Sequence, residues 1–520
     1  MMPSDPYVFE NLWRAYRACR RTKRATINAL RFEIDAEANL LQLQRELRDH
    51  TYRPGRSICF VTGGPKPREV FAADFRDRVV HHLLVARLER VFEPMFIHDS
   101  YACRLGKGTL AASDRLMEFL RRATANGRRP AWAIHLDVAS FFPSIHKRTL
   151  FALIARRVRH PELRWLTHAI LFHDPTVDYH FQSRGKPSAA PGGRGYPVPA
   201  AKSLFGKANE RGLPIGNLTS QFWANVYLNE VDQFVKRTLR CRHYVRYVDD
   251  MVLLAERPEQ LREWRDAIAT CLRERLRLRL RPELSEPFAV SAGIDFVGWK
   301  TWWSHRVPRR QTLSNLGKRL RQFERAAVRP ALNGSAQRIE LQSADGVASV
   351  ARLRAVVASY AGHFRHGATA RLWGESWARH RWLAALFVRD RFDVHTRWPT
   401  RPVVASRFRD QYRQLIRYAG SQCLVFCRVG RFVEFYGSQR VIAQRVLGLP
   451  CARRGRAGYA LVVGFLTAQE SRYLARAIDS GLAAVEIRQT HRSPLGVGCR
   501  TRLVGCVIVP GRNDERASRR

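Results

Sequence analysis

The stretch His243–Leu254, HYVRYVDDMVLL, decides how this chain of 520 residues folds. Apolar and β-branched residues flank two adjacent carboxylates, Asp249 and Asp250. This pattern predicts a β-hairpin whose tight turn carries the acids. Adjacent aspartates repel one another and each raises the pKa of the other. A bound Mg²⁺ removes that cost, because hard divalent cations prefer oxygen ligands and paired cations serve phosphoryl transfer.

A second segment, Ala133–Ile145 (AIHLDVASFFPSI), supplies a third carboxylate. Ile134 and Leu136 alternate with His135 and Asp137, which predicts a strand that carries Asp137 at its end. An Asp-Asp pair alone is typical of an acidic surface turn. Three carboxylates, in contrast, can hold two metal ions about 4 Å apart. Such a site activates a primer 3′-hydroxyl and stabilises the leaving pyrophosphate, which is nucleotidyl transfer.

Over roughly residues 50–310 the chain resembles the reverse transcriptase family, because many blocks occur in the order of that family. The blocks are Lys66–Val70, Asp74–Val80, Phe92–Phe96, Ser100–Thr109, the two aspartate segments and Gly293–Trp299. The resemblance implies Asp137, Asp249 and Asp250 as catalytic residues and as ligands of two Mg²⁺ ions, for which Mn²⁺ can substitute. It also implies template RNA, a cDNA or DNA primer and dNTPs as binding partners.

The same resemblance assigns nucleotide and primer contacts. Phe142 resembles an aromatic steric gate that leaves no room for a ribose 2′-hydroxyl, and a core position beside Phe141 is the alternative. Lys66 and Arg68 resemble the residues that meet the incoming triphosphate, since a point charge and a bidentate fork both suit phosphate. The other residues assigned in this way are Ile215, Gly216 and Gln221 for nucleotide binding and Phe296, Gly298 and Trp299 for the primer grip.

Residues 212–229 (GLPIGNLTSQFWANVYLN) narrow the resemblance to a subgroup of the reverse transcriptase family. Most group II intron-type reverse transcriptases of bacteria have Gln at the position of Ile215, and Ser-Pro where this chain has Ser220-Gln221. The variant resembles the reverse transcriptases of diversity-generating retroelements. Those enzymes copy a template RNA with errors opposite adenines, often with a small basic accessory protein. Ile215 cannot hydrogen-bond the nascent base pair, which predicts weaker discrimination; simple packing of this side chain is the alternative.

The net charge is +45, from 90 Lys and Arg against 45 Asp and Glu. A chain this basic needs a polyanionic partner. A ribosomal or membrane-surface role would explain the charge but not the carboxylates. No run of apolar residues is long enough to span a membrane, and the N-terminus lacks the apolar core of a signal peptide. Ten scattered cysteines without paired CxxC motifs favour neither zinc nor disulfides, so we expect a bacterial cytoplasmic protein without a membrane partner.

Residues 415–512 contain a further set of ordered segments, 424–436, 472–489 and 503–511. In this order they resemble the N-terminal mismatch-binding domain of the MutS family, a small α/β fold with a mixed sheet. The sequence contains no Walker A loop, so we expect no ATPase of the MutS kind.

The Phe-x-Glu signature of that domain is matched by Phe432 and Glu434, which follow Gly430. Arg431 stands where MutS proteins usually have Asp. The resemblance implies a ring that wedges into a mispaired step and a carboxyl group that bonds the displaced base. A strand-core ring beside Phe426 and Phe435 is the alternative.

The expected fold class is α+β: a right-hand polymerase, with an antiparallel sheet in fingers and palm and a helical thumb, then a small mixed-sheet domain resembling MutS domain I. The expected parts are a helical N-terminal extension (1–50), fingers and palm (51–300) with a loop insertion (174–211), a helical thumb (301–395), a linker (396–414), the MutS-like domain (415–512) and a basic tail (513–520). Alternation in Leu276–Arg281 also predicts a strand.

Three functions remain open at this point. One is a diversity-generating reverse transcriptase. Another is a bacterial reverse transcriptase with a different role, such as phage defence or intron mobility. The third is a non-catalytic nucleic-acid-binding protein that uses the same scaffold.

Overall fold

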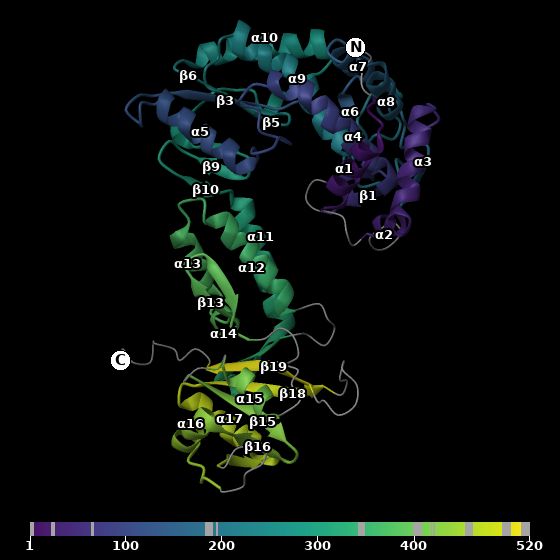
Figure 1. The fold of residues 1–520 in the computed structure, drawn as a ribbon. Coiled ribbons are helices and arrows are strands. Elements are labelled where there is room, and N and C mark those ends of the chain that lie inside the picture. Colours follow the sequence, from purple (N-terminus) through teal and green to yellow (C-terminus); the bar gives the residue numbers. More distant parts are fainter. Residues whose placement is uncertain are drawn as a thin grey trace. The chain divides into compact units, whose positions relative to one another are not determined.

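The computed structural model describes residues 5–21, 26–63, 67–182, 191–193, 196–341, 349–398, 408–417, 419, 422–452, 461–490 and 501–510. The chain forms two compact units, Met1–His305 and Arg306–Arg520. Figure 1 labels their elements in chain order.

Unit 1 begins with three helices, α1 (Phe9–Arg20), α2 (Ile27–Ile34) and α3 (Ala36–Arg48). Helices α1 and α2 pack against α4 (Phe75–Phe92). Helix α4 starts at Asp74, whose side chain accepts a hydrogen bond from the backbone N–H of Arg76 at 3.1 Å, as an N-cap residue does. The N-terminal extension is therefore helical and shares its core with the rest of unit 1.

A three-stranded sheet follows, in the order β2-β1-β4. Its strands are β1 (Ser57–Thr62), β2 (Arg68–Ala72) and β4 (Tyr179–Phe181). Strand β4 comes from the stretch that the sequence predicts as a loop insertion, and it pairs parallel with β1. Buried Glu69 of β2 accepts hydrogen bonds from the hydroxyl of Ser203 and from the backbone N–H of Leu204. The described part of that stretch is thus bound to the sheet at two points.

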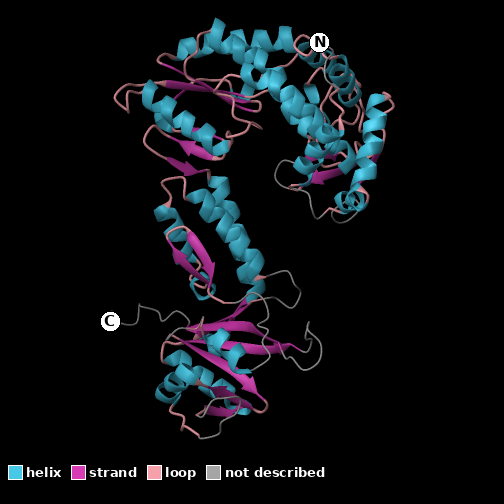
Figure 2. Ribbon diagram, in the orientation of Figure 1, coloured by secondary structure: helices cyan, strands magenta, loops and turns pink. Residues whose placement is uncertain are grey.

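The central sheet of unit 1 has the order β5-β6-β3-β7, and all neighbouring strands are antiparallel. Its strands are β5 (Tyr244–Tyr247), β6 (Asp250–Ala255), β3 (Trp132–Leu136) and β7 (Phe288–Ala289). Helix α10 (Pro258–Leu276) packs on β3 and β6, and α5 (Thr109–Ala123) packs on β5 and β6 (Figures 1 and 2). Ile134 and Leu253 share a core with α10, whereas Ala133 and Val252 share one with α5. Helices thus cover both faces of the central sheet. For this reason the sequences of its strands are nearly continuous apolar runs.

Further helices and a hairpin complete unit 1. The helices are α6 (Phe141–Ser144), α7 (Lys147–Ala155), α8 (Pro161–Leu171) and α9 (Leu218–Gln233), and the hairpin strands are β8 (Ile294–Phe296) and β9 (Trp299–Thr301). Helix α9 packs between α4, α7 and α10. Most of its side chains are buried, so it is a central helix of the unit.

The strand predicted over Leu276–Arg281 is wrong. Helix α10 continues through Leu276, and Arg277 ends it with a left-handed φ of +54°. The chain then runs past the end of β3, where the backbone N–H of Arg281 donates to the carbonyl of Asp137 at 2.8 Å. The alternation of leucine and arginine in this stretch has another cause. Buried Leu276 belongs to the core side of the helix, and buried Leu278 belongs to the segment after it.

Unit 2 contains helices and a seven-stranded mixed sheet. The elements before the last domain are β10 (Arg306–Pro308), α11 (Arg310–Ala327), α12 (Val350–Phe364), α13 (Ala370–Arg379), α14 (Leu383–Leu386), β13 (Phe387–Asp390) and β14 (Asp393–Thr396). The sheet has the order β11-β12-β19-β18-β15-β16-β17, in which β15 and β18 pair parallel and the other neighbours antiparallel. Its strands are β11 (Val328–Ala331), β12 (Ala336–Glu340), β15 (Cys423–Val429), β16 (Phe432–Phe435), β17 (Val463–Leu466), β18 (Ala483–Thr490) and β19 (Thr501–Pro510).

This sheet corrects two expectations about residues 301–414. The predicted all-helical thumb contains the hairpin β11–β12, which joins the C-terminal sheet by pairing with β19. The predicted linker contains helix α15 (Phe408–Ile416). A single hydrophobic core includes Phe323 of α11, Trp373 of α13 and Val425 of β15. On the other face of the sheet lie α16 (Gly437–Leu447) and α17 (Glu470–Asp479). The helices and the C-terminal sheet of unit 2 therefore form one body.

Within the residues that the structure describes, no helix is both long and apolar enough to cross a membrane.

Candidate active site

The two central acids lie at a strained turn. Tyr247 pairs with Asp250, which leaves Val248 and Asp249 as the two turn residues between β5 and β6. Val248 has a φ of +57°, a left-handed conformation that costs an L-amino acid about 1–2 kcal/mol. It is rarer still for a β-branched residue. Surrounding contacts must therefore hold this turn in place.

Arg246 provides that support from inside the protein. Its side chain and that of Asp232 are both fully buried (0% exposed). The guanidinium donates to both carboxylate oxygens of Asp232 at 2.8 and 2.6 Å, to Ser100 at 3.0 Å and to Asn225 at 3.2 Å. The remaining N–H donates to the carbonyl of Val248 at 2.7 Å. All five donors of the guanidinium are thus used, and one of them fixes the turn that carries the acids.

Asp137 and Asp249 lie together. Strand β3 pairs with β6 so that Leu136 faces Met251, which places Asp137 beside the turn. The two carboxyl groups are close enough to interact directly. Burial, followed by the charge of Asp137, raises the pKa of Asp249 to about 7. Two adjacent carboxylates repel one another when both are charged, so the pair favours a bound cation.

The other contacts of the acids explain their orientation. Arg281 Nη1 lies 2.8 Å from Asp137 Oδ2, and Asp250 Oδ1 is hydrogen-bonded to His135 Nε2. Among the described residues, no group of three or more Asp, Glu, His and Cys side chains is arranged to hold a metal ion. The structure thus brings together two of the three predicted ligands and turns Asp250 toward His135. Two adjacent, partly exposed carboxylates are oxygen donors that fit a hard divalent cation.

The predicted steric gate, Phe142, follows Asp137 by five residues, at the start of helix α6. Phe141 is 2% exposed and belongs to the core, whereas Phe142 is half-buried with its ring centroid 5.3 Å from that of Phe141. The carbonyl of Phe142 accepts a hydrogen bond from the backbone N–H of Leu213 at 2.9 Å. Phe142 is therefore tied directly to the loop that contains the predicted nucleotide-binding residues.

That loop, residues 212–217, also binds to β2. The carbonyl of Ile215 accepts from the backbone N–H of Phe71 at 2.9 Å. Gly216 has a φ of +120°, and a Cβ there would lie 2.7 Å from the side chain of Val70. Glycine is needed at this position because the loop packs closely on the strand. Ile215 is half-buried, and Gly216 and Gln221 are exposed.

Of the two predicted phosphate contacts, only Arg68 is among the described residues. It is exposed at the start of β2, and no described residue forms an ion pair with it. Lys66 lies outside the described residues. The predicted primer grip is the β8–β9 hairpin, in which Phe296 pairs with Trp299. Both rings are buried, so they hold the hairpin, and its turn residue Gly298 (φ +90°) is half-buried.

In unit 2, the turn Gly430-Arg431 connects β15 to β16, with a φ of +63° at Gly430. Phe432 is 43% exposed at the start of β16. Glu434, two residues on, lies on the same face of the strand and accepts a hydrogen bond from the hydroxyl of Tyr436. The alternative that Phe432 is a core ring is wrong. Its strand partner Leu466 is also exposed, at 47%, so the two side chains form an apolar patch.

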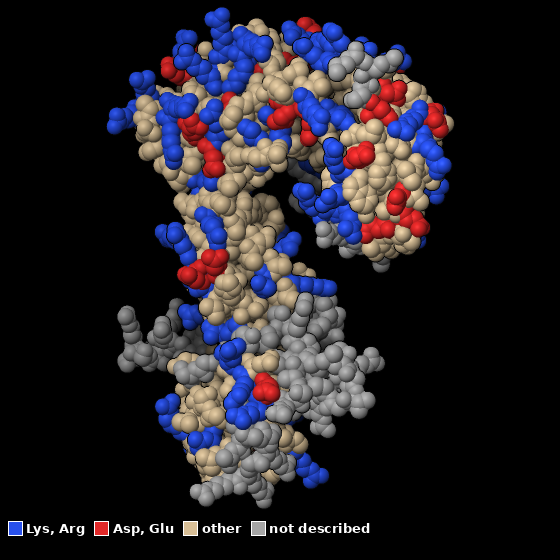
Figure 3. All heavy atoms as spheres, viewed as in Figure 1, with Lys and Arg blue, Asp and Glu red and all other residues tan. Residues whose placement is uncertain are grey.

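Positive charge is abundant on the visible face of unit 1. In Figure 3, Lys and Arg side chains gather over the region of α10, and Asp and Glu are fewer there. Sequence reasoning missed Arg246, Asp232 and Arg281 as contributors to the site. The available signal was an arginine at a strand position between apolar and aromatic neighbours, where a charge is rare unless it is paired.

Comparison with known proteins agrees with this geometry. Residues 64–301 match the family "Reverse transcriptase (RNA-dependent DNA polymerase)", and residues 406–515 match "MutS domain I". The first match contains the three aspartates and the hairpin β8–β9. The second contains α15 and the last five strands of the sheet, including Phe432.

Several curated proteins are similar to parts of the chain. Protein YkfC of Escherichia coli is 23% identical over 320 residues, which are 55% of this chain and 75% of that protein. The uncharacterized 91 kDa protein in cob intron of Schizosaccharomyces pombe is 25% identical over 205 residues, 39% of this chain and 21% of that protein. Group II intron-encoded protein LtrA of Lactococcus lactis subsp. cremoris is 21% identical over 203 residues, 38% of this chain and 28% of that protein. The chain thus spans less than a third of the length of the last two.

A solved structure of apo telomerase from Candida tropicalis, truncated from the C-terminal domain, has a TM-score of 0.32 and 10% identity, with 48% of this chain and 53% of that chain covered. This likeness is too low to bear on the fold. The family matches carry the conclusion: the chain contains a reverse transcriptase domain, the catalytic domain of RNA-directed DNA polymerases, followed by a MutS domain I.

Proposed function

We propose that this protein is an RNA-directed DNA polymerase that copies a template RNA into cDNA from a DNA primer and dNTPs. The observation that carries the proposal is the contact between Asp137 and Asp249 at the end of the central sheet, inside the reverse transcriptase match. A small basic accessory protein is a further proposed partner.

Each side chain of the site has a distinct part in this proposal. Asp137 and Asp249 would hold Mg²⁺, and Asp250, which is hydrogen-bonded to His135 in this structure, would be a third ligand. The bound ions supply activation of the primer 3′-hydroxyl and stabilisation of the pyrophosphate. Arg281 orients Asp137 through the 2.8 Å contact.

Two side chains act on the incoming nucleotide. The half-buried ring of Phe142 excludes a ribose 2′-hydroxyl by its bulk. The exposed guanidinium of Arg68 binds the triphosphate as a fork.

Primer extension on an RNA template with Mg²⁺ tests the proposal. Asp249→Asn keeps the size of the side chain but removes a carboxylate. It should lower the rate by about a thousandfold, because loss of metal-assisted charge stabilisation removes several kcal/mol. Asp266→Asn on α10 removes an exposed carboxylate away from the site and is the matched control. Equal rates for the two variants would favour the non-catalytic alternative.

We further propose that the cDNA is made with errors at adenines, as in diversity-generating retroelements. Support comes from Ile215, whose apolar side chain lies on the loop bonded to Phe142 and to β2. Ile215→Gln adds a hydrogen-bonding group at that place and should lower the error frequency opposite adenines in sequenced cDNA. An unchanged error frequency opposite adenines would favour a reverse transcriptase with another role, in phage defence or intron mobility. A neighbouring pair of near-repeats that differ at adenines would favour the first role.

For the MutS domain I, we propose binding of mismatched duplex through Phe432 and Glu434. The ring of Phe432 is 43% exposed and can stack on a base, a contact worth about 1–3 kcal/mol. Phe432→Ala should therefore weaken binding of mismatched duplex about tenfold and leave matched duplex unchanged. Val441→Ala removes another exposed apolar side chain of the same domain and is the control. Equal loss on both duplexes would contradict the wedge.

A further inference from the structure

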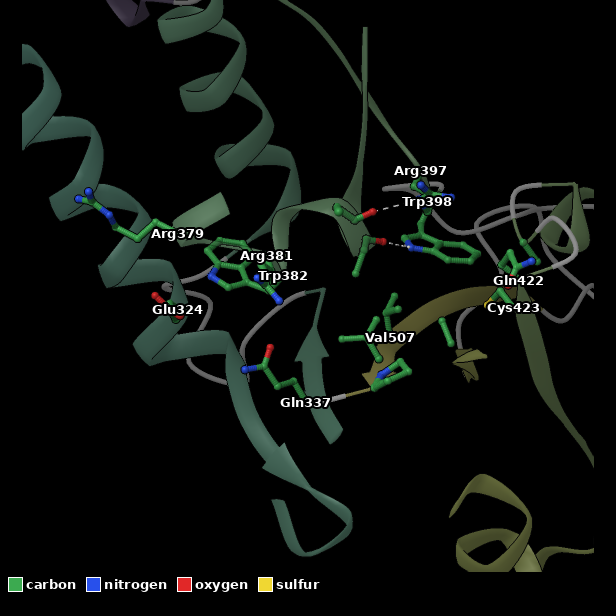
Figure 4. A pocket seen from close by; sticks show the side chains of 16 residues that line it. Glu324, Gln337, Arg379, Arg381, Trp382, Arg397, Trp398, Gln422, Cys423 and Val507 are labelled. Atoms are coloured by element: carbon green, nitrogen blue, oxygen red, sulfur yellow. Dashed lines mark hydrogen bonds between the residues drawn. The ribbon is translucent and has the colours of Figure 1, made fainter. Parts of the chain in front are cut away.

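A cavity of about 680 Å³ lies inside unit 2, away from the residues discussed so far. Its walls come from several parts of the unit. They are Glu324 of α11, the segment from α13 to the residues after β14, the residues just before β15, and the sheet strands β12, β15, β18 and β19. In the view of Figure 4, Arg379, Arg381 and Trp382 lie on one side, and Trp398, Gln422 and Cys423 lie on the other. The cavity is thus formed where the helices meet the C-terminal sheet.

The charge of this cavity is positive. Three of its lining residues are arginines: Arg379, Arg381 and Arg397. Arg379 and Arg381 are exposed, and no described residue forms an ion pair with either of them. Glu324 is the one carboxylate among the described lining residues. It contacts His380, whose Nδ1 lies 3.2 Å from Oε2 of Glu324. Arg379 and Arg381 therefore offer donors to a ligand.

A buried polar group in the wall also lacks a partner. Trp382 is 2% exposed, and its indole Nε1 has no hydrogen-bond partner among the described residues. An unpaired buried N–H is unfavourable and is normally satisfied. Trp398 in the same wall differs, because its Nε1 donates to the carbonyl of Ala385 at 2.7 Å. The side-chain amides of Gln337 and Gln422 add further polar atoms, and Val507 and Val509 supply an apolar floor.

We propose that this cavity binds the phosphate of a nucleotide, with the arginines on the phosphate oxygens. A guanidinium presents parallel N–H donors that match phosphate oxygens, so Arg is well suited to such a site. Ligand pockets commonly have volumes of about 300–1,000 Å³ and combine an apolar floor with a few polar groups. The phosphate belongs either to the end of a nucleic-acid strand or to a free nucleotide, and both have the same recognition chemistry. The residues that line this site include neither the aspartates nor Phe432.

The test measures binding to the full-length chain by fluorescence anisotropy of a labelled single strand, at about 0.15 M salt. One strand carries a 5′-phosphate and the matched strand a 5′-hydroxyl, and free dAMP is added as competitor. We expect the 5′-phosphorylated strand to bind about tenfold tighter, which is the effect of one charge-assisted pair. The double substitution Arg379→Gln and Arg381→Gln should abolish this preference.

A control removes the same charge elsewhere in unit 2. Arg354→Gln with Arg371→Gln neutralises two exposed arginines outside the cavity, and it should weaken both strands equally while the preference stays. Ala384→Trp fills the cavity without any change in charge and should also abolish the preference. Near-equal melting temperatures exclude misfolding as the cause.

Competition by dAMP against both strands, lost in the cavity variants, would assign the site to free nucleotides. No effect of phosphate in any of these assays would overturn the proposal. So would an equal loss in the control variant. Because no synthesis is measured, these results hold whether or not Asp249→Asn abolishes polymerisation.

Discussion

Arg246→Met is the substitution that most sharply tests how the acidic turn is held. Methionine keeps the length and apolar stem of the side chain but removes five N–H donors. The carboxylate of Asp232 then stays buried, with the hydroxyl of Tyr244 at 2.7 Å as its remaining neutral donor. Breaking a fully buried ion pair in this way costs about 3–5 kcal/mol. That is a large share of the ordinary stability of a domain, about 5–15 kcal/mol.

Hydrogen exchange of the β5 and β6 amides measures this loss, because it reports the opening of unit 1 alone. Arg262→Met removes an exposed arginine from α10 and should change the free energy of unfolding by less than about 0.5 kcal/mol. A loss below about 1 kcal/mol in Arg246→Met would refute the ion-pair reasoning.

A double variant separates stability from positioning. Arg246→Met with Asp232→Leu removes both charges, so at least about half of the lost free energy should return. The carbonyl of Val248 nevertheless stays without its 2.7 Å donor, and the turn is free to relax from its left-handed conformation. We therefore expect primer extension to remain low in a refolded, stable protein. Full activity in the double variant would refute the idea that the guanidinium positions Asp249.

Other substitutions test separate features. Phe142→Val should weaken discrimination against ribonucleotides about tenfold or more in single-nucleotide incorporation. Unchanged discrimination would contradict the role of Phe142 as a steric gate. Gly216→Ala should destabilise unit 1 by about 1–3 kcal/mol in thermal unfolding, because its Cβ meets a β2 side chain at 2.7 Å. Gly63→Ala meets nothing within 4 Å and should be neutral. In unit 2, burial alone would raise the pKa of Glu486, but its hydrogen bond and ion pair with Arg338 lower it. The stabilisation by this pair is complete above the unfolded pKa of about 4.3 and is lost as the pH falls through the lower folded value. Arg338→Leu should thus destabilise at neutral pH, with a difference that shrinks in acid; a constant difference would contradict the linkage.

Local patterns in the sequence predicted the parts of the site that are contiguous in the chain. The run HYVRYVDDMVLL predicted the β5–β6 hairpin and its acidic turn, because alternation and turn chemistry are local properties. The alternation before Asp137 predicted β3 for the same reason. Periodicity did not identify which charged residue pairs with Arg246, since any of 45 acids was available and the choice depends on how α9 packs.

The errors have a similar origin. The alternating arginines after Leu276 predicted one face of a strand. In the structure, Arg281 of this stretch contacts Asp137 instead. Strand β11 directly follows the amphipathic helix α11, and the periodicity of residues 301–395 predicted only helices. Strand β11 pairs with the nearby strand β12. Strand β12 in turn pairs with β19 through residues more than 160 apart in sequence, a distance over which no local signal acts. The exposure of Phe432 was likewise undecided until its strand face was known.

The proposed polymerase requires that Asp137 and Asp249 hold a divalent cation together. Fe²⁺ bound in place of Mg²⁺, with ascorbate and peroxide, produces hydroxyl radicals that cut the nearby backbone. The cut positions can then be read by mass spectrometry. We expect cuts next to both residues 137 and 249, suppressed by excess Mg²⁺ and absent in Asp249→Asn. Cuts beside only one of the two residues, or cuts that persist in the variant, would contradict it.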